Sequence, residues 1–448
     1  MRFNDAAWLF PLAGPALLAP LGVALMAAGL GRGRHVTHTL LTALAAWGAA
    51  ALGYALIGFH LAGYPGSPAL VFRLHGTAWN YLAWVWRVPE QFLLPAYAWR
   101  LFGLLAAGWM AVVISAGALE RWKLSRTVLA AFIFGALLAP LPLHWLWNGG
   151  WLAMLGQNFG LGHGAMDLGE TTAIQACGGA GALALAWQVG ARRHKFNSQG
   201  EPNALPGHST VLMLTGCGLT LAGWLAWNAI SALMVAHISP WLLARTEINT
   251  LLAAICAFLC ALLLGRWRFG RPDASIAVNA WLGGLVASSA AAPFLSLPAN
   301  LLTASAAGAI VFFSIPWLEQ KLRLDDPAGV IPAHLLAGIW GLLAAGLFAR
   351  LWFYWPAGSP RFLMQGVVPS FHGVPLPIFP SWGQWAAQIV VVVTLLGCLL
   401  PLAYAVIWLI ERLWPGRVTP EAEARGLDLY ELGSSAYPEM VTHGDEFL

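Results

Sequence analysis

Charged side chains are scarce in this sequence. Asp, Glu, Lys and Arg make up only 9% of its 448 residues, whereas soluble globular proteins carry about 25%. This scarcity excludes an ordinary soluble globular protein. The net charge is a modest +4, and we expect no nucleic-acid partner.

Cysteine is also scarce, and its spacing is not that of a metal site. All five cysteines lie inside apolar runs, without a Cys-x-x-Cys pair or an adjoining histidine. Such cysteines ordinarily act as small buried apolar residues, so we expect neither a disulfide framework nor a metal site. A nucleophile–base set and a cofactor motif are missing too, so we expect no enzymatic activity and no cofactor.

Apolar residues dominate what is present. They make up 59% of the chain, with 25 Trp, 49 Gly and 28 Pro, and the mean hydropathy is +0.69. Glycine and proline are tolerated in transmembrane helices. One crossing needs about 20 apolar residues. The composition therefore predicts an all-α polytopic membrane protein embedded in the lipid bilayer.

The apolar runs divide the chain into eleven transmembrane helices and a polar tail. We expect residues 1–411 to form the membrane domain and residues 412–448 a cytoplasmic C-terminal tail. The expected spans are 8–30, 37–62, 92–118, 127–147, 169–191, 208–235, 243–265, 275–292, 297–317, 328–349 and 384–410.

The basic residues of the short loops alternate in the register expected for one common face. Five breaks, at 31–36, 120–126, 192–200, 266–272 and 318–326, together hold thirteen Lys and Arg. The opposite loops hold only a few, such as Arg73, Arg87, Arg245 and Arg361. The positive-inside rule then places the N-terminus outside and the C-terminus in the cytoplasm. We expect a multi-pass protein of the plasma (inner) membrane.

A weak internal symmetry links spans 5 and 10. Asp167 precedes Gln175 by eight residues, and Asp326 precedes His334 by the same number. Eight helical residues rise about 12 Å, which brings both residues near the bilayer midplane. The two spans enter from opposite sides, as in transporters built from inverted repeats. We therefore expect a five-plus-five inverted repeat plus one extra helix.

The buried polar residues of these spans have structural and functional interpretations. His334 lies in an apolar helix, where an ionisable residue suggests function because its burial is costly. Asp167 and Glu170 match a capping pattern, and Asp326 before Pro327 matches an N-cap and first helical residue. An anionic cap can also attract cations, so both roles can coexist.

Four stretches resemble the ammonium transporter (Amt/Mep/Rh) family, in the order of that family. They are HWLWNGGWLAMLG, AGWLAWNAISAL, DDPAGVIPAHLLAGIWGLLAAGLF and GLDLYELGSSAY. The resemblance implies eleven helices, a homotrimer and one narrow hydrophobic pore per subunit for ammonium or ammonia. It also implies a tail that docks under neighbouring subunits, and a PII-type signalling protein as a partner. In the tail, Leu432 and Ser434 replace the family's usual His and Glu.

The resemblance assigns site residues one by one. Trp147 matches the aromatic residue of the outer vestibule, Ser231 its hydroxyl partner, and Asp167 the acid below the vestibule. Trp227 matches the inner ring of a stacked aromatic gate. The outer ring falls on Ala106, which leaves half of the gate missing unless a neighbouring ring takes the place. The neighbouring candidates are Phe102 and Trp109.

The pore histidines depart from the family pattern. His334 matches the second histidine, but the first is replaced by Gln175, which keeps hydrogen bonding and cannot titrate near neutrality. Three functions stay open: ammonium transport, an ammonium sensor with little or no conduction, and a pore for a methylated amine or another small neutral solute.

Overall fold

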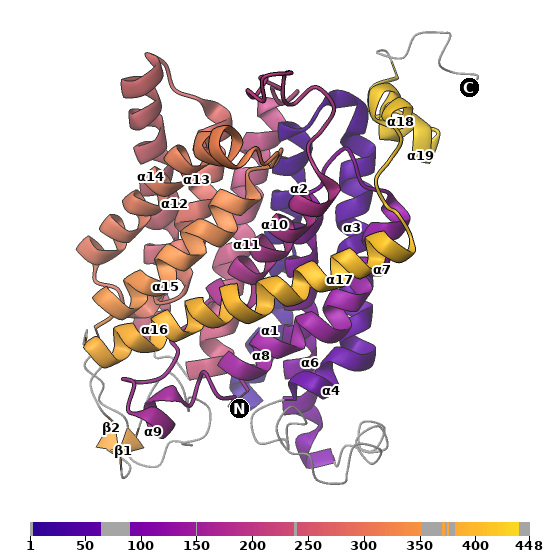
Figure 1. Cartoon of the computed structure of the whole chain (residues 1–448). Coiled ribbons are helices and arrows are strands. Elements are labelled where there is room, and N and C mark those ends of the chain that lie inside the picture. The colour runs from indigo at the N-terminus through magenta and orange to yellow at the C-terminus, as the bar shows by residue number, and fades with distance from the viewer. Residues whose placement is uncertain are drawn as a thin grey trace.

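A computed structural model describes residues 3–63, 90–148, 150–236, 240–350, 370–371, 374–375 and 381–438 of the chain. Arg73, Arg87 and Arg361, three of the basic residues assigned to the opposite loops, lie outside the described residues. The structure is a helical bundle in which α1 (Phe3–Ala16) begins at one end and α19 (Leu427–Leu432) lies at the opposite end (Figure 1).

Eleven helical segments of the described residues correspond to the eleven expected spans. Nine are long and apolar enough to cross a membrane, α13 (Ala274–Ser289) is a shorter apolar helix, and η5 (Thr171–Ala176) continues into α10 (Cys177–Val189). The prediction of an eleven-helix all-α membrane protein is therefore confirmed.

The first half contributes α1 (Phe3–Ala16), α2 (Leu18–Leu30), η1 (Gly33–His35), α3 (Val36–Gly53), η2 (Tyr54–Gly58), α4 (Phe59–Ala62), α6 (Glu90–Ala116), α7 (Leu124–Ile133), η4 (Phe134–Leu138), α8 (Pro140–Leu146) and α9 (Leu155–Phe159). The second half contributes α11 (Thr210–Ala236), α12 (Pro240–Phe269), η6 (Ala292–Phe294), α14 (Leu297–Leu322), η7 (Ile331–Leu336) and α15 (Ala337–Phe348). The last span joins α16 (Trp382–Thr394), η8 (Leu395–Leu399) and α17 (Leu400–Leu413), and it slants across the bundle (Figure 1).

The packing brings together helices of both halves. The first-half helix α2 packs along α11, and α10 packs against η7 of the second half. The short strands β1 (Ser370–Phe371) and β2 (Val374–Pro375) form an antiparallel pair at the end of the bundle where α9 lies (Figure 1). The central helices η5 and η7 are thus enclosed by other helices, which shields their polar side chains from lipid.

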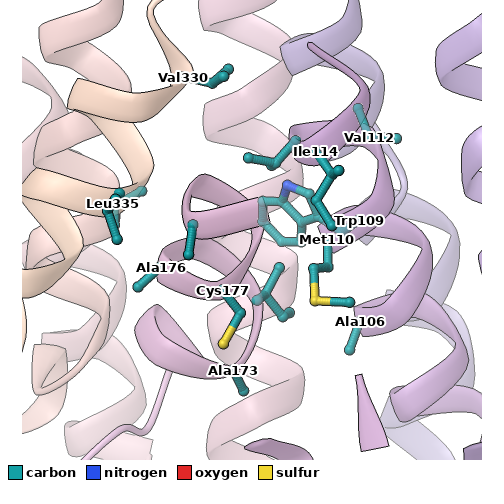
Figure 2. Packing of buried hydrophobic residues seen from close by; sticks show 14 of the residues in the cluster. Ala106, Trp109, Met110, Val112, Ile114, Ala173, Ala176, Cys177, Val330 and Leu335 are labelled. Carbon is teal, nitrogen blue, oxygen red and sulfur yellow. The ribbon is translucent and has the colours of Figure 1, made fainter. Parts of the chain in front are cut away.

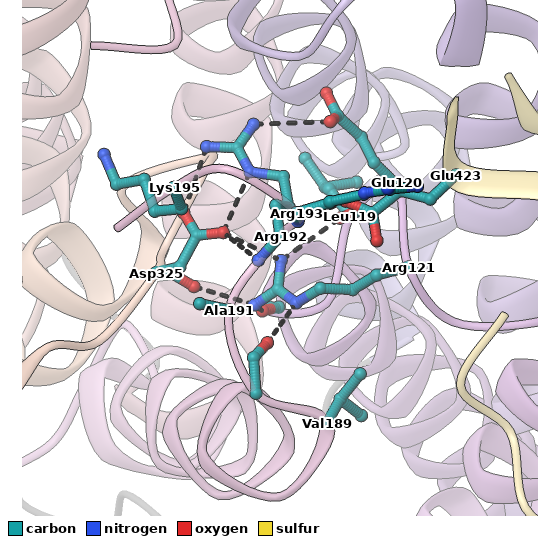
Figure 3. Close-up of polar contacts among 12 residues, drawn as sticks. Leu119, Glu120, Arg121, Val189, Ala191, Arg192, Arg193, Lys195, Asp325 and Glu423 are labelled. Atoms are coloured by element: carbon teal, nitrogen blue, oxygen red, sulfur yellow. Dashed lines mark hydrogen bonds and ion pairs between the residues drawn. The ribbon is translucent and has the colours of Figure 1, made fainter. Parts of the chain in front are cut away.

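A buried ion network ties several helix ends together. Asp325 accepts hydrogen bonds from the Arg192 Nε and Nη2 atoms at 2.9 and 3.0 Å, and its backbone oxygen accepts one from Arg121. Glu120 forms ion pairs with Arg32 at 2.5 Å and with Arg192 at 3.4 Å. Figure 3 shows how Glu120, Arg121, Arg192 and Asp325 converge. The network joins the loop after α2 to the ends of α6 and α10 and to the segment before η7.

The charge of Asp325 depends on the two arginines. Burial by itself would raise the pKa of this carboxyl, but Arg121 and Arg192 outweigh burial and lower the pKa from 3.8 to about 2. The folded state therefore binds this proton more weakly than the unfolded chain does. The resulting stabilisation is present above pH 3.8 and is lost as the pH falls towards 2.

The C-terminal tail docks on helix starts of its own subunit through α18 (Pro420–Arg425) and α19 (Leu427–Leu432). Asp428 accepts hydrogen bonds from the backbone N–H groups of Thr37 and His38 at the start of α3, at 3.1 and 2.7 Å. Between the two helices, Gly426 has a φ of 105°, and a Cβ atom there would lie 2.6 Å from the Arg34 carbonyl oxygen. Glycine is therefore required at this turn.

We predict that Asp325→Asn will destabilise the protein by about 3–5 kcal/mol, because the buried guanidinium group of Arg121 loses its counter-charge and that of Arg192 keeps only Glu120. The measurement is the thermal midpoint of the detergent-solubilised protein. Glu319→Gln is the control, since it removes the Lys195 ion pair, in which the Glu319 side chain is 27% exposed, and should cost below about 1 kcal/mol. Equal effects of the two variants would contradict a structural role of the network.

Candidate functional site

Two short π-helical segments begin with the same arrangement. The Asp167 Oδ2 atom accepts hydrogen bonds from the Thr172 and Ala173 backbone N–H groups at 2.9 and 3.3 Å. The Asp326 Oδ2 atom accepts one from Ile331 at 2.7 Å. In both cases the first donor lies five residues after the acid. The internal symmetry expected from the sequence therefore extends to the backbone.

The structure corrects two details of the expected caps. Pro327 was expected as the first helical residue, but η7 begins only at Ile331, because the chain first makes a turn at Gly329. Glu170 was expected to reach back to the cap, but neither of its carboxylate oxygens has a hydrogen-bond partner within the described residues. Glu170 and Gly329, each three residues after its acid, have left-handed φ values of 58° and 65°.

Gln175 and His334 meet between the two segments. The His334 Nδ1 and Gln175 Oε1 atoms are 2.8 Å apart, and both side chains are completely buried. Because an amide oxygen only accepts, the Nδ1 atom must carry the proton of the neutral ring. The His334 Nε2 lone pair and the Gln175 amide N–H groups are left without partners among the described residues. The pair therefore offers one acceptor and one donor.

Small residues allow η5 and α10 to approach η7. A Cβ atom on Gly179 would lie 2.5 Å from the backbone nitrogen of Leu335, the residue after His334. Leu335 faces the helix that carries Ala176, and Met110 and Ile114 of α6 lie on the other side of that helix (Figure 2). Such close backbone approach is the usual role of glycine between membrane helices. It sets the distance between Gln175 and His334.

A second ring stacks on Trp227 in the structure. The Phe102 ring stacks on Trp227 with centroids 4.9 Å apart and an interplanar angle of 8°. Of the two neighbouring candidates, Phe102, one helical turn before Ala106 on α6, is thus the ring that stacks on Trp227. Trp109 contacts the Trp227 ring edge-on at 5.5 Å. Ala106 lies between Phe102 and Trp109 in the sequence of α6. Its small side chain leaves room for the Trp227 indole, which both rings contact.

Trp147 continues this row of rings. It directly follows α8, and its ring lies 5.2 Å from Phe102 and 6.4 Å from Trp99. Ser231 lies one turn after Trp227 on α11 and is fully buried. Its Oγ atom has no hydrogen-bond partner in the described part of the chain. The structure thus gathers Trp147 and Trp227 around Phe102, and Ser231 lies one turn beyond Trp227 on α11.

We define the aromatic row by its six rings, which come from α6, the end of α8, and α11. They are Trp99, Phe102, Trp109, Trp147, Trp224 and Trp227. The sequence analysis missed Trp99 and Trp224. The spacing of 99, 102 and 109 on α6, and of 224 and 227 on α11, is the helical signal that could have revealed them.

Ser289 connects the aromatic row to the turn after Asp167. Its Oγ atom accepts a hydrogen bond from Trp224 Nε1 at 2.7 Å, and its backbone oxygen accepts one from Gly169 at 2.9 Å. No sequence pattern pointed to Ser289. The acid, the rings and the Gln175–His334 pair therefore belong to one continuous buried region.

These features define a class of protein. Two acid-capped helix starts from the two halves of the chain meet at a buried polar pair, which is the plan of helical transporters and channels with a midplane site. A family model described as the Ammonium Transporter Family matches residues 7–437. The chain belongs to the ammonium transporter family.

Known relatives cover most of the chain. Ammonium transporter Amt2 of Archaeoglobus fulgidus is 29% identical over 425 residues, covering 94% of this chain and 85% of the relative. The ammonium transporter of Bacillus subtilis is 25% identical over 444 residues, covering 98% of this chain and all of the relative.

Solved structures share the fold. A protein titled Sensor Amt Protein aligns with a TM-score of 0.78 and 23% identity, covering 95% of this chain and 98% of its own. Mep2 of Saccharomyces cerevisiae aligns with a TM-score of 0.72 and 19% identity, covering 94% and 88%. The described helices therefore have the arrangement seen in these membrane proteins.

We predict that Gly179→Val will separate the two helices and break the Gln175–His334 hydrogen bond. Overpacking of this kind costs about 1–3 kcal/mol, and ammonium uptake should be abolished. Uptake by proteoliposomes and the thermal midpoint are the measurements. Gly397→Ala is the control, because nothing lies within 4 Å of its added Cβ atom. Normal uptake by Gly179→Val would show that this spacing is unimportant.

Proposed function

We propose that this protein transports ammonium across the membrane and passes it as ammonia along a hydrophobic pore in each subunit. The buried Gln175–His334 pair carries this proposal. Ammonia has N–H donors and one lone pair. The His334 Nε2 atom can accept an N–H, and the Gln175 amide can donate to the lone pair, so the pair matches a small neutral amine without needing a charge.

Cation recruitment is assigned to Trp147, Ser231 and Asp167. A cation over an indole face gains about 0.5–2 kcal/mol. The free Ser231 hydroxyl oxygen adds an acceptor for an ammonium N–H. Asp167 supplies negative charge behind this entrance. Ammonium suits this entrance, since it combines positive charge with four donors.

The stacked rings of Phe102 and Trp227 are assigned as the gate. Both are almost completely buried, so a solute must displace them to move inward. A full charge in an apolar surround is costly. The cation therefore gives up a proton before it reaches His334, and ammonia continues alone.

The remaining assignments follow the family and the loop charges. Arg32, Arg121 and Arg192 of three basic loops converge in one network, which supports a common cytoplasmic face and an N-terminus outside. We propose a homotrimer in the plasma (inner) membrane, with residues 1–411 as the membrane domain and 412–448 as the tail. A PII-type protein at the tail is the proposed regulatory partner.

An ammonium sensor with little conduction is the second candidate. It is favoured by the replacement of a pore histidine by Gln175 and by the likeness to the structure titled Sensor Amt Protein. A pore for a methylated amine is less favoured, because Phe102 completes the gate that Ala106 was expected to leave open.

Transport is tested with purified protein in proteoliposomes pulsed with ammonium and then with methylammonium. We predict ammonium uptake by the parent protein and a two- to thirty-fold higher half-saturation for Trp147→Leu, corresponding to the loss of about 0.5–2 kcal/mol of cation–π attraction. Trp382→Leu is the control, since Trp382 is 84% exposed. Ammonium binding without uptake would favour the sensor, and preference for methylammonium would favour the altered pore.

We predict that Gln175→His will raise conduction or change its pH dependence. A second titratable ring within hydrogen-bond distance of His334 permits proton sharing that an amide cannot provide. The measurement is the membrane current of proteoliposomes between pH 5 and 8. His334→Ala should strongly reduce uptake, because the acceptor is lost. If neither variant changes the current, the pair does not line the conduction path.

A further inference from the structure

Glu170 is a buried acid for which the assigned site has no use. Its side chain is completely buried, and both carboxylate oxygens lack a hydrogen-bond partner within the described residues. The charged group that acts on it is Asp167, a carboxylate of the same sign. An unpaired buried charge is strongly unfavourable, so such a group requires a proton or a cation.

The backbone gives no structural reason for a glutamate at this position. Glu170 has a φ of 58°, a conformation that L-residues other than glycine rarely adopt. The matching position of the second repeat is Gly329, with a φ of 65°. Glycine thus forms the same turn without strain, whereas Glu170 forms it with strain. Strained residues of this kind gather at functional sites.

Other unpartnered oxygens lie around the same turn. The Asp167 Oδ1 atom has no partner in the described chain, and neither has the Asn228 Oδ1 atom. The Asn228 oxygen points at the turn, since a Cβ atom on Gly169 would lie 2.8 Å from it. Asn228 is 2% exposed, and its amide nitrogen already donates to Thr250. The unpartnered oxygens of Glu170, Asp167 and Asn228 are all acceptors. A hydrogen-bond donor with a positive charge would therefore pair with them.

We propose that Glu170, Asp167 and the Asn228 oxygen form an inner site for the ammonium cation. The site lies beside the aromatic row, because Asn228 directly follows Trp227 and the turn is joined through Ser289 to Trp224. Glu170 supplies the charge and Asn228 a neutral acceptor. This inference rests on the proposed function and adds a second cation position between Trp147 and the Gln175–His334 pair.

The proposal assigns an order to the path of the substrate. The cation reaches the turn beside the rings while still charged, because the Glu170 carboxylate pairs with it. Gln175 lies five residues after Glu170, about 7.5 Å along a helix. Ammonium would thus give its proton to the Glu170 carboxylate, and ammonia would continue to the Gln175–His334 pair.

The test measures binding separately from transport. The thermal midpoint of the solubilised protein is recorded in ammonium chloride and in sodium chloride of equal ionic strength. A ligand that binds only the folded state raises this midpoint. We expect a specific ammonium shift in the parent protein, and its loss in Glu170→Gln, which keeps the shape and removes the charge. The half-saturation of uptake should rise at least ten-fold.

Glu170→Gly separates strain from binding. Without ammonium this variant should be more thermostable than the parent, because glycine adopts the turn freely, and it too should lose the ammonium shift. Glu247→Gln makes the same chemical change in α12 and is the control, with the parent's shift and half-saturation expected.

The outcomes distinguish the two proposals. If the parent binds ammonium but does not transport it, the transport proposal is wrong. The inner site is then judged only by the ammonium-dependent shift of the thermal midpoint. If the parent transports ammonium and both Glu170 variants keep its shift and half-saturation, the inner site is overturned and transport stands. A shift lost equally in Glu247→Gln would also overturn the inner site.

Discussion

The hydrogen bond between Gln175 and His334 depends on the close contact of two helices that come from different halves of the chain. A bond of 2.8 Å between short side chains requires their backbones to approach more closely than ordinary side chains allow. Gly179 provides that approach, because even a methyl group there would collide with the backbone of Leu335. Glycine content, which looks unfavourable for helices, thus determines the geometry of the site.

The same environment explains why so many polar atoms are arranged in caps. A bilayer supplies no water to unpaired backbone groups, so each helix start inside the bundle needs an internal acceptor. Asp167 and Asp326 fill this need with one oxygen each. At both residues the second oxygen stays unpaired within the described chain.

Much of the fold could be predicted because the apolar runs and the basic loops leave few alternatives. The eleven spans, and the pairing of Gln175 with His334 through matching acids, followed from length, spacing and resemblance. The outer ring of the gate could not be placed by counting along α6, since Ala106 and Phe102 share one helical stripe and only the position of the Trp227 indole decides between them. Ser289 and Asn228 act through contacts across helices, which leave no pattern in a single sequence.

The ion network at the ends of α6 and α10 has a consequence for how the protein can move. Arg192 follows α10, the last helix of the first repeat, and Asp325 precedes η7 of the second repeat. The hydrogen bond between them therefore links the two repeats at one face of the bundle. Transporters that rock one repeat against the other must break such ion pairs in every cycle. Here breaking it would expose buried charges each time. The network therefore favours a fixed arrangement of the two repeats over a rocking movement of one against the other.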